Sequence, residues 1–175
     1  GQYNKIPLSE KISEEHEKFQ SVAFLVIHQD SLLHESYYNG YGEDSKSNSF
    51  SMAKSYVSAL LGKAIEEGKI ESLDQKVGDF LPAYQTDLAA DLTVGDLSSM
   101  ASGLDWNEKY DLSINGMMEA YITPDLDKLM NSRKVTSAPG EGFVYLSGNT
   151  QLLGMVLTKA LGQSLSSYFE EKSWK

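Results

Sequence analysis

Ser51 and Lys54 are the two residues whose types and spacing could do chemistry. They stand three apart at the start of an expected helix over 51–67, and side chains at that spacing project from one helix face. An amine beside a serine hydroxyl can take its proton and turn the oxygen into a nucleophile. In the alternative interpretation, Ser51 only caps the helix and Lys54 is solvated. The pair alone leaves both interpretations open.

The expected place of Ser51 in the first helical turn would assist a nucleophile. Backbone N–H groups of that turn have no partner within the helix, and the helix dipole favours negative charge there. The N–H of Ser51 could therefore supply half of an oxyanion hole. Lys54 is flanked by an apolar helix and could be buried enough to lose its proton.

Tyr145 is the second candidate for chemistry. It ends a stretch, 142–145, that we expect to be short and extended, and small polar residues follow it into a helix. A tyrosine can act as general acid or base when a nearby cation favours its phenolate form, and Lys54 would be that cation. The alternative is a tyrosine packed at a strand end, with Asn149 as the cap of the next helix.

Hydrophobic patterning predicts the elements that must position these residues. An N-terminal helix is expected over 8–19, and the continuous apolar run 22–27 predicts a strand buried on both faces. Turn residues at 29–31 lead into a returning strand at 32–38. The helix at 51–67 ends at Gly68. Beyond it we expect an ordered segment at 73–81 and helices from Thr93 to about Gly103, at 114–122, at 125–132, at 150–161 and at 164–172. One hairpin followed by helices is an α+β fold that is mostly helical.

Composition limits the class of protein. The chain has 175 residues, of which 41% are hydrophobic and 23% charged, as in a globular domain with a core. The net charge of −10 disfavours nucleic acid and anionic membranes as partners. There is no cysteine, so disulfides and thiolate metal sites are excluded. No stretch approaches the roughly 18 apolar residues of a membrane span. No signal-peptide pattern is present, and Gly1 could result from processing, so the compartment stays open.

Several motifs occur in a defined order along most of the chain from residue 22 onward. They are SFSMAKS at 49–55, EGKI at 67–70, LDQKV at 73–77, FLP at 80–82, LTVGDLSSMASGLDW at 92–106, PGEGFVY at 139–145 and QLLG at 151–154. Together they resemble the serine β-lactamase and penicillin-binding-protein superfamily, which uses an S-x-x-K motif. The closer resemblance is to its class C-like branch, which includes esterases, peptidases and amide hydrolases.

The resemblance implies roles for individual residues. Ser51 matches the acylated nucleophile, Lys54 the lysine that shares its proton, and Tyr145 the tyrosine that assists proton transfer to the leaving group. Ser147 stands where the family often has the asparagine of Tyr-x-Asn, a substitution also found in members that resemble amide hydrolases. It argues against true β-lactamase activity. Substrate contacts are therefore expected from Ser147, with Asn149, Trp106 and Tyr110 as further candidates; the two aromatic residues could equally be buried or packed in loops.

The resemblance also implies that part of the fold lies outside this sequence. Family members continue past Trp174 with more sheet strands and a third motif of K-T-G or H-x-G type, and none follows Tyr145 here. An apolar hairpin by itself is marginal in water and has an open edge. We therefore expect residues 1–175 to form a single, incomplete domain, with a helix and hairpin in 1–50 and a helical region in 51–175. A C-terminal segment, a second chain or a homodimer contact would complete it.

The leading hypothesis is a serine hydrolase that acts on a small-molecule or peptide amide or ester through an acyl-enzyme. The resemblance implies neither a cofactor nor a metal, and it favours a bacterial protein in the periplasm or secreted. Two alternatives remain: a non-catalytic member that binds peptides or peptidoglycan, and a structural fragment that needs a complementing chain. We expect the isolated chain to be inactive or nearly so.

Overall fold

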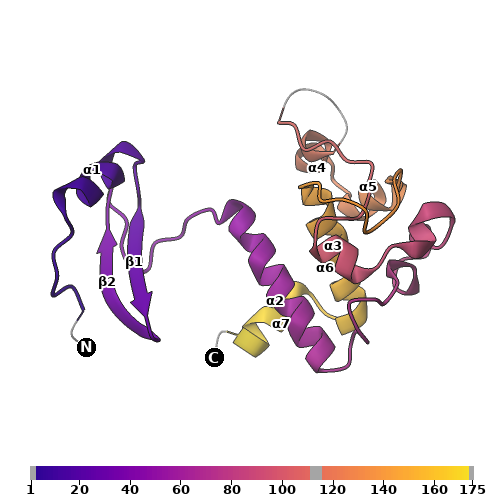
Figure 1. The fold of residues 1–175 in the computed structure, drawn as a ribbon, viewed down its shortest axis with the longest axis horizontal. Coiled ribbons are helices and arrows are strands. Elements are labelled where there is room, and N and C mark those ends of the chain that lie inside the picture. Colours follow the sequence, from indigo (N-terminus) through magenta and orange to yellow (C-terminus); the bar gives the residue numbers. More distant parts are fainter. Residues whose placement is uncertain (1–2, 111–115, 174–175) are drawn as a thin grey trace. The chain divides into compact units, whose positions relative to one another are not determined.

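The structure is a computed structural model that describes residues 3–110 and 116–173, and Figure 1 draws it as a ribbon. The chain divides into two compact units, residues 1–49 and 50–175. The first holds one helix and an antiparallel hairpin, and the second is helical. The prediction of a mostly helical α+β fold with one N-terminal hairpin is confirmed.

The first unit consists of α1 (Glu10–Lys18), β1 (Ala23–His28) and β2 (Ser31–Tyr37). The strands pair from Ala23 with Tyr37 to His28 with Ser31, and the register shifts between Val26 and Ile27. The connecting residues Gln29 and Asp30 both have positive φ, 48° and 58°, as a two-residue hairpin turn of type I′ requires.

The prediction that 22–27 is buried on both faces is wrong. Leu25 is 46% exposed and Ile27 is 67% exposed, whereas the alternate residues Phe24 and Val26 are partly buried. The reason is the two-residue period of a strand: α1 packs on one face, where the ring of His16 lies 4.5 Å from that of Phe24. The opposite face of the hairpin keeps its apolar side chains exposed.

The second unit is built around α6 (Ser147–Leu161), which packs against several other helices. These are α2 (Ala53–Glu66), α3 (Val94–Ser98), α5 (Leu126–Ser132) and α7 (Leu165–Ser173). Leu152, Leu153, Val156 and Leu157 form one helical face and are almost fully buried. The start of α6 is therefore held by the main hydrophobic core.

Shorter elements connect these helices. Three 3₁₀ turns lie between α2 and α3, namely η2 (Val77–Asp79), η3 (Pro82–Tyr84) and η4 (Asp87–Asp91), and α4 (Met117–Ile122) precedes α5. Residues 114 and 115 of the helix expected at 114–122 lie outside the described residues. Within the described ranges, no helix is both long and apolar enough to cross a membrane.

Three predicted boundaries are wrong. Ser51 lies in a 3₁₀ turn, η1 (Phe50–Met52), and the α-helix begins directly after that turn, at Ala53. The helix α3, whose start is closed by a capping box between Thr93 and Asp96, ends at Ser98 rather than near Gly103, because Met100 turns the backbone with φ 60°. The third is α6, which begins three residues before the predicted 150.

Candidate active site

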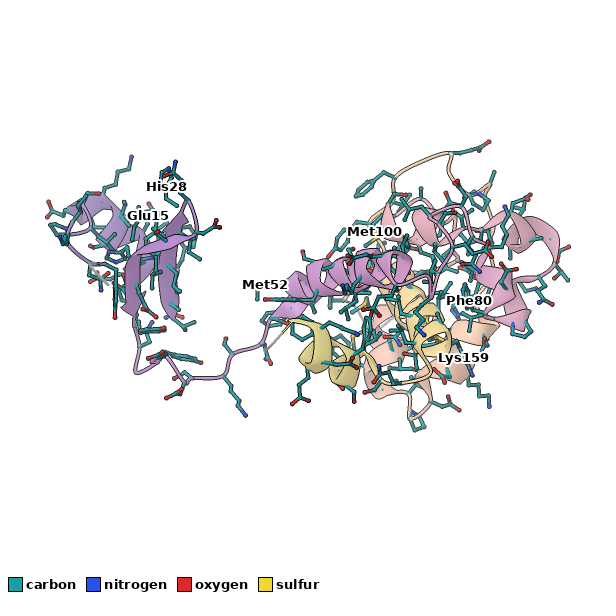
Figure 2. All side chains as sticks on the ribbon, turned by 90° about the horizontal axis from the view of Figure 1, so that it is seen from below. Glu15, His28, Met52, Phe80, Met100 and Lys159 are labelled. Carbon is teal, nitrogen blue, oxygen red and sulfur yellow. The ribbon has the colours of Figure 1, made fainter. Side chains whose placement is uncertain are left out.

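The nucleophile candidate and its lysine meet at the start of α2. Ser51 lies in η1 and is exposed, and Lys54, the second residue of α2, is partly buried. The distance from Lys54 Nζ to Ser51 Oγ is 3.4 Å. The spacing of three residues brings both side chains to one side of the helix start. Figure 2 marks this end of α2 with Met52, whose side chain is exposed.

Lys54 also contacts the start of α6, far away in sequence. Its Nζ donates a hydrogen bond of 3.0 Å to Oγ of Ser147, the first residue of that helix. The same Nζ lies 5.2 Å from the centroid of the Tyr145 ring. The packing of α2 on α6 therefore brings together the four side chains of Ser51, Lys54, Tyr145 and Ser147.

A fifth side chain, Glu108, was missed by the sequence analysis. Its Oε1 accepts a hydrogen bond of 2.5 Å from Ser147 Oγ. Its Oε2 accepts one of 2.6 Å from Ser147 N and one of 3.0 Å from Trp106 Nε1. A carboxylate on the first N–H of α6 is favoured by the helix dipole. The only sequence signal is the pair Trp106 and Glu108 in one loop, which does not predict the contact with Ser147.

An open cleft of about 1150 Å³ runs past the nucleophile candidate. Ser51, Lys54 and Ser147 line it, with Tyr110 and Tyr121 among the other lining residues. Desolvation raises the pKa of Tyr110, and the nearby Glu108 carboxylate adds to that rise. The phenol of Tyr110 is therefore protonated at neutral pH and can donate a hydrogen bond to a molecule in the cleft.

Two of the expected substrate contacts lie elsewhere. Asn149 is 0% exposed inside α6, where its Oδ1 accepts a hydrogen bond from Ser102 Oγ and its Nδ2 donates to Met100 Sδ at 3.5 Å. It therefore does not cap the helix either, because the chain is already helical two residues earlier. Trp106 is 9% exposed and does not line the cleft. The structure thus gives both residues a packing role, whereas Tyr110 and Ser147 do face the cleft.

Gly148 explains how Trp106 can lie so close to α6. A Cβ atom on Gly148 would be 2.7 Å from Trp106 Cδ2 and 2.8 Å from Cε3, well inside van der Waals contact. Only a residue without a side chain permits this approach. The close packing holds the indole N–H toward Glu108, and through Glu108 it connects to Ser147.

Comparisons with known proteins identify the family of the chain. The family model for β-lactamase matches residues 8–175. The 6-aminohexanoate-dimer hydrolase of Paenarthrobacter ureafaciens is 26% identical over an alignment of 164 residues, and this alignment covers 86% of this chain and 42% of that protein. The chain therefore spans less than half the length of this curated relative.

Solved structures show the same fold. A provisionally named 6-aminohexanoate-dimer hydrolase from Bacillus anthracis matches with a TM-score of 0.75 and 22% identity, over 94% of this chain and 46% of that one. A class C β-lactamase matches with a TM-score of 0.68 and 22% identity, over 92% and 45%. The family match covers nearly all of the sequence, and on that ground the chain belongs to the β-lactamase family.

Proposed function

We propose that the protein is a serine hydrolase that cleaves an amide or an ester through an acyl-enzyme on Ser51. The observation that carries the proposal is the place of Lys54 Nζ, 3.4 Å from Ser51 Oγ and 3.0 Å from Ser147 Oγ. A neutral amine in that place can accept the serine proton while the oxygen attacks a carbonyl carbon. Membership of a family of hydrolases supports the same chemistry.

In the proposed reaction, Ser51 Oγ bonds to the carbonyl carbon and its proton passes to Lys54. The carbonyl oxygen becomes an oxyanion, for which the backbone N–H of Ser51 at the helix start is one candidate donor. The bond to the leaving amine or alcohol then breaks, and that group takes up a proton. Tyr145 lies beside Lys54 and is the candidate to assist this transfer. Water finally hydrolyses the acyl-enzyme and restores Ser51.

The relatives favour a small substrate with an amide bond. One is named as a hydrolase of the 6-aminohexanoate dimer, and other structural neighbours are class C β-lactamases. The open cleft leaves room for a chain-like substrate beside Ser51. The relatives are about twice as long as this chain. The N–H of Ser51 would supply only half of an oxyanion hole, and removing even one donor typically costs ~10²–10³ in rate. We therefore expect residues 1–175 alone to turn over little or no substrate.

The proposal is tested by labelling the full-length natural protein with a fluorophosphonate probe and locating the adduct by mass spectrometry. The expected result is one adduct, on Ser51. Ser51→Ala should abolish it, and Ser55→Ala is the matched control because Ser55 is an exposed serine four residues further on, in the first turn of α2. Failure to label Ser51 would refute the proposal. An unlabelled protein that still bound a peptide or peptidoglycan fragment would instead identify a non-catalytic binding member of the family.

A further inference from the structure

The hydrogen bonds of Glu108 fix which atom donates at each contact. A carboxylate has only acceptors, so Ser147 Oγ must give its single proton to Glu108 Oε1. The other carboxylate oxygen accepts from two N–H groups, Ser147 N and Trp106 Nε1. Three donors therefore hold one carboxylate in a single orientation. Charge-assisted hydrogen bonds of this kind are stronger than neutral ones.

The direction of the Ser147 proton has a consequence for Lys54. A hydroxyl has one proton and two lone pairs, and the proton of Ser147 is taken by Glu108. Lys54 Nζ, 3.0 Å away, therefore faces a lone pair of Ser147 Oγ and donates one of its own N–H groups to it. The lone pair of a neutral lysine amine then remains available for another partner.

That partner is Ser51. To take the nucleophile's proton, the Lys54 lone pair must face Ser51 Oγ, which lies 3.4 Å from Nζ. A Ser147 proton pointing at Nζ would compete for the same lone pair. We propose that Glu108 is a positioning residue that turns the Ser147 proton away from Lys54 and so reserves the lysine lone pair for Ser51. This inference rests on the proposed serine-hydrolase function.

The substitution Glu108→Gln tests this arrangement with almost no change in shape. The amide oxygen must face Ser147 N and Trp106 Nε1, because the opposite orientation would point donors at both N–H groups. The amide NH₂ then faces Ser147 Oγ and donates to it. The Ser147 proton is thereby released from its position and can point at Lys54, where it occupies the lone pair that Ser51 needs.

The measurement is the rate constant for labelling of Ser51 by a fluorophosphonate in the full-length natural protein. In that step the Ser51 Oγ–P bond forms, the P–F bond breaks, fluoride leaves and the serine proton passes to Lys54. Well-placed general bases contribute ~10²–10⁴ in rate, so Glu108→Gln, which impairs but does not remove the base, should lower the rate constant roughly tenfold to hundredfold. Asp105→Asn is the matched control, since it removes one exposed carboxylate from the same loop.

A double-mutant cycle separates positioning from a structural effect. If Glu108 acts through the Ser147 hydroxyl, Glu108→Gln should cost little further rate in a Ser147→Ala background. The unfolding midpoint of each variant is measured beside the rate. A wild-type rate in Glu108→Gln, or equal losses in both backgrounds, would overturn the inference. If the wild-type protein does not label at Ser51, both the inference about Glu108 and the proposed function are overturned. The wild-type measurement by itself therefore distinguishes this outcome from a failure of the inference alone.

Discussion

Lys54 Nζ and Ser147 Oγ lie 3.0 Å apart although 93 residues separate them in the sequence. Lys54 is the second residue of α2 and Ser147 is the first residue of α6, so the contact joins two helix starts. Each helix buries its apolar face in the common core of residues 50–175. The distance between these two polar atoms is therefore set by core packing, and a change in that packing should affect the chemistry.

Ser147 should tolerate asparagine better than alanine. Alanine removes the acceptor of Lys54 and the hydroxyl that Glu108 accepts from, and the Ser51 labelling rate should fall roughly tenfold to hundredfold. Asparagine offers an amide oxygen to Lys54 and an NH₂ group to Glu108, which are the same two functions. Ser147→Asn should therefore keep a rate closer to wild type. The measurement is the fluorophosphonate labelling rate of the full-length natural protein.

Two control measurements accompany the prediction for Ser147. Ser99→Ala removes an exposed helix-end hydroxyl that donates, among the described residues, to backbone oxygens of its own helix turn, and it should leave the rate unchanged. The unfolding midpoints of all variants are recorded to exclude loss of the folded state. Equal labelling rates in Ser147→Ala and Ser147→Asn would contradict the assignment of donor and acceptor around Ser147.

Gly148→Ala should destabilise the protein. The added methyl group would lie 2.7 Å from Trp106 Cδ2, and overpacking of this kind costs about 1–3 kcal/mol. It should also slow Ser51 labelling, because displacing Trp106 disturbs its hydrogen bond to Glu108. Urea denaturation gives the free energy of unfolding.

Gly154→Ala is the matched control on the same helix. Its nearest neighbour would be Leu165 Cδ1 at 3.5 Å, an ordinary contact, and alanine favours a helix interior by about 0.5–1 kcal/mol over glycine. This variant should be as stable as wild type or more so. If both glycine variants changed stability by the same amount, close packing of Trp106 on Gly148 would not be the reason.

Local patterns could be predicted from the sequence, and long-range contacts could not. Thr93 and Asp96 stand three residues apart and form a capping box, a local pattern whose two hydrogen bonds both lie within one helical turn. Glu108 was missed because its partner Ser147 lies 39 residues further on, in another element. Such a contact is created by the packing of the loop on α6, which no periodicity in the sequence reports.

The errors over burial have the same origin. The run 22–27 is apolar at every position, which is typical of a strand covered on both faces, yet Ile27 is 67% exposed. Periodicity states which residues favour burial but not what covers them. Asn149 shows the converse: a polar residue type suggested a helix cap or a substrate contact, and its place in α6 makes it part of the core.

Asn149→Ala should lower the free energy of unfolding, and it should not weaken the binding of the probe, because Asn149 is buried inside α6. The substitution leaves the buried hydroxyl of Ser102 without its acceptor, and an unsatisfied buried polar group costs about 1–3 kcal/mol. Thr150→Ala is the neighbouring control, because Thr150 lines the cleft and should affect reaction with the probe more than unfolding. Urea denaturation and the labelling rate are measured for both. A stable Asn149→Ala variant with poor probe affinity would contradict the packing role.

Glu67 should make the stability of the helical unit depend on pH. At the end of α2, its carboxylate bonds to Lys172 Nζ at 3.1 Å and accepts from Tyr168 Oη at 3.1 Å, both on α7. These contacts, with Lys172 the largest cause, lower the pKa of Glu67 from its ordinary value of 4.5. The folded protein therefore binds this proton less readily than the unfolded chain. The stabilising contribution is present above the unfolded pKa and is lost as the pH falls through the lower, folded pKa.

Glu67→Gln should remove that stabilising contribution. The unfolding midpoint of the variant should therefore lie below that of wild type at pH 7, and the two midpoints should approach each other at low pH. Glu66→Gln is the control, because the neighbouring carboxylate is 70% exposed and pairs with Lys63 on its own helix rather than with α7. Thermal unfolding of the three proteins is followed from pH 7 to pH 3 at constant ionic strength. A difference between wild type and Glu67→Gln that stayed constant over this range would mean that the Glu67 charge does not bind α7 to α2. The Tyr168 hydrogen bond would not account for such a difference, because an uncharged amide oxygen can also accept it.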